Sequence, residues 1–284
     1  MDKFTLLLII ILVYLIIKKN IYESFESLIF KDDVTSGKIP NIIWTFWDKE
    51  ELPGFINQCV KSWKKHNPNY QVNVINKQNL YDYLDKDEAD YILNWKHIDN
   101  VQKLADIIRL RLLVKYGGIW LDASIVAFKT FNWIHNEEIE LENGTKTQAD
   151  AIVFTDGAPV NPIIHNWFIA SVPNGKYVTD WYNELTGVDQ YESLDDYREK
   201  QENREHIDHN YLLAYVCARK IYNQIGPRHV KLINAVEGPY DYFVKGGLEV
   251  ICDHKKTFAK LRKDEREQMT AKIESCLFEP FKNI

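Results

Sequence analysis

The sequence of 284 residues has no excess of basic residues, and this shortage argues against one broad class of function. Lys and Arg number 35 against 41 Asp and Glu, which gives a formal net charge of -6 and a pI near 5.8. Proteins that bind a nucleic-acid backbone need a positive field, because the phosphate charges dominate that affinity. We therefore expect no nucleic-acid partner. Internal repeats and low-complexity tracts are also missing, and the chain length suits one sizeable core.

Cysteine is scarce and widely spaced. The four cysteines are Cys59, Cys217, Cys252 and Cys276, and no two of them form a CxxC pair. Their number is far below the density of a disulfide scaffold. We therefore expect them to be mainly buried thiols.

Long hydrophobic runs are absent apart from residues 4–17, which are bounded by Lys3 and by Lys18 and Lys19. A typical bilayer core needs roughly 20 apolar residues, so this run spans a membrane only with snorkelling lysines or local thinning. No small-x-small cleavage pattern follows it, which favours an uncleaved signal-anchor over residues 1–20 rather than a cleaved signal peptide. We expect a single-pass membrane protein. The side of the membrane on which the rest of the chain lies stays open, because the flanking lysines favour the cytosol whereas an ordinary lumenal type II protein needs the opposite.

The order of the expected elements predicts the fold class. Residues 21–38 are mixed and polar, as in a stem, and residues 39–284 form the predicted catalytic domain. A strand at 39–47, a helix at 55–65 and a strand at 70–75 open an α/β unit. A helix at 101–116 then ends at a Gly-Gly pair, strands follow at 119–121 and 151–154, and another short element follows at 167–171. We predict an α/β domain with a mostly parallel sheet flanked by helices, whose ligands bind at the carboxyl ends of strands.

The most informative stretch is residues 105–124. Asp106 and Arg109 are three residues apart on the predicted helix, so they share a face and are able to form an ordinary local ion pair. Here, however, a helix stop and a short buried strand follow, and the strand delivers Asp122 at its carboxyl end. In an extended backbone Asp122 and Ser124 point to one side and Ala123 to the other. The combination indicates a functional site.

This stretch resembles the capsular-polysaccharide-synthesis glycosyltransferases and, more distantly, the DXD-motif sugar transferases that include the glucosylating bacterial toxins. Both are GT-A-type families. The resemblance also covers the Ile-Pro-Asn-Ile-Ile-Trp run at 39–44 and the Trp-Lys-Lys-His-Asn-Pro run at 63–68, and it continues faintly at 166–170 and 254–257. It implies a GT-A-like fold and a nucleotide-sugar-dependent hexosyltransferase that acts on a saccharide or glycolipid acceptor. The alternative is a catalytically inactive relative that binds sugars, whereas a hydrolase with paired carboxylates has no support in the sequence.

The resemblance also implies roles for single residues. Asp106 and Arg109 would bind the donor sugar, and Trp47 would stack on the nucleobase. Asp122 would be the first acid of the DXD motif, and with Asp106 and Arg109 it would form the catalytic set. Ser124 replaces the second acid. A hydroxyl is a weak neutral ligand, so Mn²⁺ or Mg²⁺ at Asp122 and Ser124 would be held less tightly than by two carboxylates.

The donor diphosphate needs a positive partner, because the leaving nucleoside diphosphate gains negative charge as the glycosidic bond breaks. A divalent cation is one such partner. A basic loop that contains His254, Lys255 and Lys256 is the second candidate, with an ordinary solvated turn as the equally supported alternative. Asp156 follows a predicted strand and precedes Gly157, so it is a weaker candidate for the same cleft or part of a plain turn.

Overall fold

A computed structural model describes residues 37–141, 143–156, 162–199, 212–253, 256–267 and 269–278. The predicted anchor at 1–20 lies outside these ranges, as does the predicted stem except for its last two residues. Within the described ranges no helix has both the length and the apolar character to cross a bilayer. The elements below belong to one unit that begins at Gly37.

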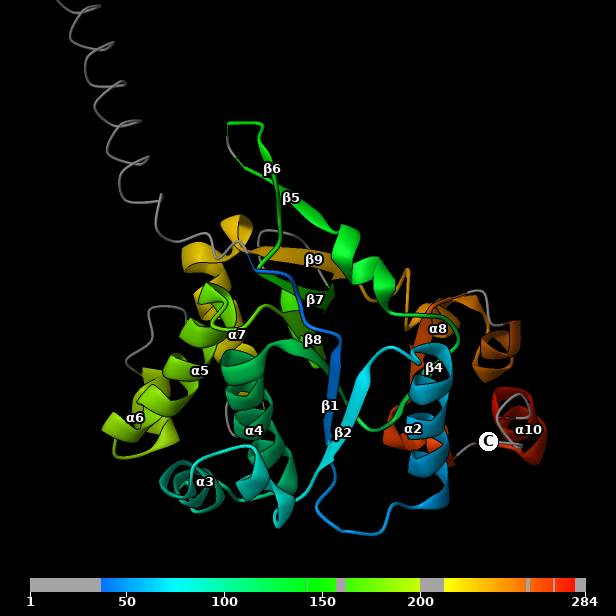
Figure 1. Cartoon of the computed structure of the whole chain (residues 1–284), viewed down its shortest axis with the longest axis horizontal. Coiled ribbons are helices and arrows are strands. Elements are labelled where there is room, and N and C mark those ends of the chain that lie inside the picture. Colours follow the sequence, from blue (N-terminus) through cyan, green and yellow to red (C-terminus); the bar gives the residue numbers. More distant parts are fainter. Residues whose placement is uncertain are drawn as a thin grey trace, which may run out of the picture. The chain divides into compact units, whose positions relative to one another are not determined.

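A six-stranded sheet with the order β2-β1-β3-β8-β7-β9 forms the centre of this unit (Figure 1). Its strands are β1 (Ile42–Phe46), β2 (Gln71–Ile75), β3 (Gly118–Leu121), β7 (Ala151–Asp156), β8 (Ile163–Ser171) and β9 (Val230–Asn234). Strand β1 is parallel to β2 and β3, and β7 is parallel to β9, whereas β8 is antiparallel to both β3 and β7. Five strands therefore run in one direction, as the predicted mostly parallel sheet requires, and β8 makes the sheet mixed.

Two small antiparallel sheets and a set of helices surround the central sheet. The small sheets pair β4 (Ile125–Ala127) with β10 (Phe258–Lys260), and β5 (Glu138–Glu140) with β6 (Lys146–Gln148). The described helices are α2 (Gly54–His66), α3 (Lys86–Leu93), α4 (Val101–Tyr116), α5 (Lys176–Gly187), α6 (Leu194–Glu199), α7 (Leu213–Ile225), α8 (Asp241–Lys245), α9 (Lys263–Glu267) and α10 (Ala271–Phe278).

Both faces of the central sheet are buried. Ile43 and Ile119 belong to the core on the face of α2, whereas their neighbours Trp44 and Trp120 belong to the core on the face of α4 and α5. Figure 1 shows α4 and α5 on one side of β1 and α2 on the other. Strands covered on both faces need apolar residues at every position, which explains their continuous apolar runs.

Helix α4 and strand β3 are joined directly, and this joint positions the site. The helix begins at Asn100, whose side chain accepts a hydrogen bond from the backbone amide of Lys103 at 2.9 Å. It ends at Gly117, where φ is 63° and the amide donates to the carbonyl of Leu113 at 2.8 Å. A Cβ at Gly117 would lie 2.7 Å from Pro173, so both the conformation and the space require glycine. The predicted helix 101–116 and its Gly stop are confirmed.

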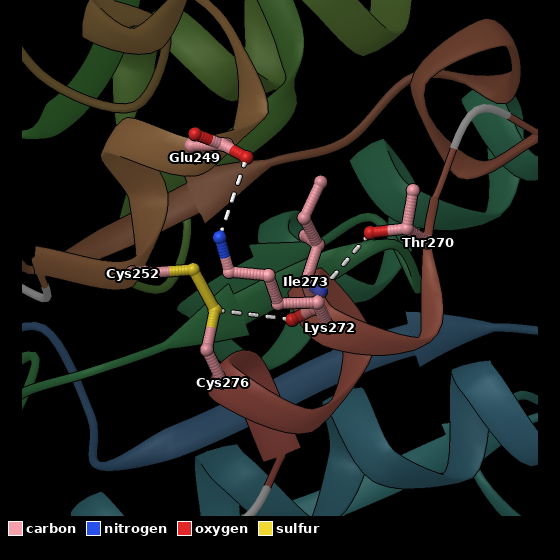
Figure 2. Close-up of a disulfide and its surroundings, with 6 residues drawn as sticks. All are labelled: Glu249, Cys252, Thr270, Lys272, Ile273 and Cys276. Atoms are coloured by element: carbon pink, nitrogen blue, oxygen red, sulfur yellow. Dashed lines mark hydrogen bonds and ion pairs between the residues drawn. A yellow bond between two sulfur atoms is a disulfide. The ribbon is translucent and has the colours of Figure 1, made fainter.

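The expectation of mainly buried thiols is wrong for two of the four cysteines. Cys252, in the 3₁₀ helix η5 (Leu248–Asp253), forms a disulfide with Cys276 in α10, and their Cα atoms are 5.6 Å apart (Figure 2). Cys59 and Cys217 are buried free thiols, as predicted, and burial raises the pKa of Cys217 to about 12. The two bonded cysteines are 24 positions apart in the sequence, so a local reading of the sequence did not pair them. The disulfide closes the segment that contains β10 and α9.

Candidate active site

A cavity of about 620 Å³ opens where β1 and β3 end. Trp47 and Asp48 follow β1 at its wall, and Asp122 and Ser124 follow β3. Because these strands are parallel, their carboxyl ends meet at one edge of the sheet, as expected for an α/β ligand site. The full lining is Phe46, Trp47, Asp48, Ile56, Val101, Gln102, Ala105, Asp106, Arg109, Trp120, Asp122, Ala123, Ser124, Asn166, Trp167, Leu212, Tyr215, Tyr240, Lys260, Leu261, Arg262, Lys263, Asp264 and Arg266.

Helix α4 contributes a buried ion pair to this cavity. The Arg109 guanidinium lies 2.8 Å from the Asp106 carboxylate, and the two side chains are only 5% and 9% exposed. The same guanidinium lies over the Trp120 ring, 4.9 Å from its centroid. A buried charge is tolerated only when it is paired and hydrogen-bonded, so each side chain depends on the other. Asp106 and Arg109 therefore form the local ion pair and also line the cavity.

Asn166 completes the ion pair, and the sequence analysis did not single it out. Its side-chain amide donates to Asp106 Oδ1 at 2.8 Å, and its backbone carbonyl accepts a hydrogen bond from Arg109. Asn166 lies on β8, and because β8 is antiparallel to β3, its first half reaches the edge at which β3 ends. The amide of Asp122 donates to the carbonyl of Trp167 at 2.8 Å there. The available signal was a polar residue inside the apolar run of β8.

Asp122 lies at the centre of the polar network. Its Oδ1 is 3.4 Å from Arg109 Nη1 and accepts a hydrogen bond from the Trp120 indole at 3.1 Å. Its Oδ2 accepts a hydrogen bond from Lys260 Nζ at 2.8 Å. Arg109 thus lies between the carboxylates of Asp106 and Asp122, and Lys260 binds the second carboxylate oxygen of Asp122.

The side chains of Asp122 and Ser124 point toward the same group, the Lys260 ammonium. The sequence also predicted that they share a side, but from an extended backbone. Lys260 Nζ lies 2.9 Å from Ser124 Oγ as well as 2.8 Å from Asp122. The backbone between them is a turn in which the Ile125 amide donates to the Asp122 carbonyl at 3.0 Å, and it is not an extended strand. The turn therefore brings the two side chains together, and Ala123 also lines the cavity.

The two carboxyl groups have opposite pKa shifts. Burial raises the pKa of Asp106 to about 6. The negative charge of Asp122 also acts to raise this pKa, whereas the positive charge of Arg109 acts to lower it. Burial alone would also raise the pKa of Asp122, but Lys260 and Arg109 outweigh it and hold that pKa at about 2. Both groups are ionised at neutral pH, and Asp106 is the first to take up a proton as the pH falls.

Among the described residues, the positive wall of the cavity comes from a stretch that follows the predicted basic loop. It consists of Lys260, Arg262, Lys263 and Arg266, which lie in β10, in α9 and between them. We call this stretch, residues 260–266, the basic segment. His254 and Lys255 lie outside the described residues. Lys256 is described, but its ammonium contacts the carbonyl of Glu237 and the carboxylate of Asp241, and it lines other cavities.

Aromatic side chains form the remaining wall. Trp47 lies immediately after β1, and its amide donates to the carbonyl of Ile75 at 2.9 Å. The indole nitrogens of Trp47 and Trp167 are buried without a hydrogen-bond partner in the described part of the chain. Buried donors are nearly always satisfied, so these two nitrogens are exceptions among the described residues. Asp156 is paired with His165 at 2.9 Å and is not part of the cavity wall.

The expected Mn²⁺ or Mg²⁺ does not fit this arrangement of donors. The residues offered are one carboxylate and one hydroxyl, and the described residues contain no group of three His, Cys, Asp or Glu that could hold a metal. The Lys260 ammonium already contacts both oxygens. A cation bound to these oxygens lies within about 5 Å of the ammonium, where repulsion is roughly 7 kcal/mol at an effective dielectric constant of about 20.

Comparisons with known proteins find similarity to named glycosyltransferases. The O-glycosyltransferase braB of Annulohypoxylon truncatum is 24% identical over 150 residues, which are 49% of this chain and 35% of that protein. Glycosyltransferase afumC of Aspergillus fumigatus (strain CBS 144.89 / FGSC A1163 / CEA10) is 24% identical over 153 residues, 49% of this chain and 38% of that protein. The chain thus spans little more than a third of these relatives. The solved PaToxG glycosyltransferase aligns with a TM-score of 0.47 and 14% identity over 92% of this chain and 91% of that one. The family described as capsular polysaccharide synthesis protein matches residues 11–216, and the chain belongs to this family.

Proposed function

We propose that this protein is a glycosyltransferase that moves a sugar from a nucleotide-sugar donor to a saccharide or glycolipid acceptor. The observation that carries the proposal is the buried pair of Asp106 and Arg109 beside Asp122, inside a cavity at the carboxyl edge of the sheet. Nucleotide ligands of α/β proteins bind at this edge. Membership in the capsular polysaccharide synthesis family and the similarity to two named glycosyltransferases support the assignment.

The cavity suits a donor that has an apolar end and a charged middle. Its volume of about 620 Å³ is in the range of small-molecule sites. The nucleobase stacks on Trp47, and the diphosphate lies against the basic segment. The sugar then lies near Asp106 and Arg109, where a carboxylate accepts hydrogen bonds from sugar hydroxyls and a guanidinium donates to them.

The transfer step requires the site to stabilise a leaving group. The bond between the anomeric carbon and the diphosphate oxygen breaks, and its electron pair stays on the nucleoside diphosphate. An acceptor hydroxyl oxygen forms the new bond to the anomeric carbon, and its proton is released to solvent. Because Lys260 and Arg109 are held in place by their contacts before the reaction, their charges stabilise the growing negative charge without reorganisation.

Membrane attachment is a separate part of the proposal and rests on the sequence of residues 1–20. An anchor there would keep the enzyme beside a glycolipid acceptor without taking part in the chemistry. Deletion of residues 1–29 should therefore release the protein from membranes and leave donor turnover unchanged. A folded but inactive truncated protein would show that this segment does more than attach the enzyme.

A donor screen tests the proposed function. The full chain is incubated with a panel of nucleotide-sugars, and release of nucleoside diphosphate is measured together with donor binding. A glycosyltransferase releases nucleoside diphosphate from at least one donor, by transfer or by slow hydrolysis. Saturable binding of a donor without release would instead identify an inactive relative. Neither binding nor release, in a folded protein, would refute the proposal.

A further inference from the structure

The most unusual feature of the cavity is the position of the Lys260 ammonium. It lies 2.8 Å from Asp122 Oδ2 and 2.9 Å from Ser124 Oγ, in the place between the two residues where a cation was expected. The Lys260 side chain is 10% exposed. A lysine that reaches into a buried polar cluster is costly unless its charge is used, so the contact calls for an explanation.

The backbone on both sides of Lys260 is fixed. Strand β10 pairs antiparallel with β4, which puts Lys260 opposite Ile125, one residue after Ser124. The Lys260 carbonyl accepts a hydrogen bond from the Tyr242 hydroxyl at 2.8 Å, and the next amide, of Leu261, donates to the Ser124 carbonyl at 3.2 Å. Strand pairing therefore fixes the Lys260 backbone beside Ser124, and its contacts with Asp122 and Ser124 fix the ammonium.

The hydrogen bonds of the ammonium leave room for a ligand. A lysine ammonium has three N–H donors, and among the described residues Asp122 and Ser124 account for two of them. The residue lines the cavity, as do Arg262 and Arg266 from the same segment. The third donor is thus available to an oxygen of a ligand in the cavity.

We propose that Lys260 takes the place of the divalent cation: its ammonium, held by Asp122 and Ser124, binds the donor diphosphate and stabilises its departure without a metal. This inference rests on the proposed function for the identity of the ligand. Asp122 then serves to position the ammonium, and a serine suffices at position 124, because an ammonium needs one strong and one weak acceptor there rather than two carboxylates. The missing second acid of the DXD pattern thereby has a physical reason.

A titration with Mn²⁺ alone tests the position of Lys260 without any donor. We compare the full-length wild type, Lys260→Met and a matched control, Lys272→Met, which removes an exposed lysine paired at 3.7 Å with Glu249, neither of which lines the cavity. Free Mn²⁺ is followed by its electron paramagnetic resonance signal. We expect no saturable site in the wild type or the control, a new site in Lys260→Met, and loss of that new site when Asp122→Asn is added.

Two results of this titration would overturn the proposal. The first is a saturable Mn²⁺ site in the wild type that Asp122→Asn removes. The second is a folded Lys260→Met protein without any gain in Mn²⁺ affinity. If Lys260→Met does not fold, Lys260→Arg keeps a positive charge there, and its titration should match that of the wild type.

Turnover provides the second test and separates the two proposals. Nucleoside diphosphate release from the donor panel is measured in EDTA and in Mn²⁺. We expect equal wild-type rates in both, and a fall of about a hundredfold or more in Lys260→Met in EDTA, the usual cost of one transition-state charge contact. Complete loss of wild-type release in EDTA with recovery in Mn²⁺ would refute the role of Lys260. Absence of release under every condition would refute the glycosyltransferase assignment, while the Mn²⁺ titration still decides the position of Lys260.

Discussion

The disulfide between Cys252 and Cys276 allows a quantitative prediction about the basic segment. The bond closes a loop whose ends are 24 residues apart, and this loop contains β10 and α9. In the chain-entropy model a loop of this length stabilises the folded state by about 3.5 kcal/mol at 25 °C. The double variant Cys252→Ser with Cys276→Ser should lose roughly this free energy of unfolding. The loss should also reach the site, because the loop carries Lys260 and is held at both ends by the bond.

Urea unfolding followed by tryptophan fluorescence measures the loss, and a reductant supplies the control. The wild type should lose the same free energy when reduced, whereas the double variant should not respond to reductant, because Cys59 and Cys217 are free thiols already. Donor affinity should fall in parallel in both cases. An unfolding free energy that differs by less than about 1 kcal/mol between oxidised and reduced wild type would refute this reasoning.

Two further predictions concern the donor site. Trp47→Ala should raise the dissociation constant of the nucleotide-sugar roughly tenfold, because base stacking contributes on the order of 1–3 kcal/mol, and calorimetric titration measures this. Binding of the intact nucleotide-sugar should weaken as the pH falls through about 6, because the pKa of Asp106 is raised to about 6 by burial and the protonated acid no longer pairs with Arg109. Donor binding is therefore stronger above this pKa, where Asp106 is ionised, and weaker below it, where Asp106 is protonated. The neighbouring Asp122, with a pKa held at about 2, stays charged throughout.

Each of these predictions has its own contrary result. An unchanged dissociation constant in a stable Trp47→Ala protein would assign Trp47 to the core and not to the nucleobase. For the pH profile the control is Asp106→Asn, which keeps a similar shape but has no proton to gain. Its affinity should stay constant across this range, and a profile identical to that of the wild type would assign the titration to another group.

Local rules were sufficient for the part of the site that lies within one continuous stretch. Helix α4 was predicted with its correct ends, because an apolar face and a Gly-Gly stop both act within a few residues. The same reasoning put Asp122 at the end of a buried strand beside Arg109. These residues needed no knowledge of distant partners, since the short connection from α4 to β3 fixes their relative positions.

The residues that were missed depend on pairings between distant segments. Asn166 reaches the site because β8 runs against its neighbours, and an apolar strand carries no local signal of its direction. Lys260 arrives through the pairing of β10 with β4, two strands of three residues whose ends are more than a hundred residues apart in the chain. Such short strands have no periodicity that a sequence reading can detect. The basic cluster at 254–256 carries a local signal and was predicted for that reason, and for His254 and Lys255 this stays a prediction; Lys260 carries no comparable local signal.

The measurement that tests the central claim most directly is the rate of nucleoside diphosphate release in Asp122→Asn. This change keeps the size of the side chain and removes the charge that holds both Lys260 and Arg109 at the cavity. With the donor that the wild type turns over, we expect a fall of about a hundredfold or more, and no change in Lys272→Met measured beside it. An Asp122→Asn protein that folds and releases nucleoside diphosphate at the wild-type rate would contradict the placement of the transfer chemistry in this cavity.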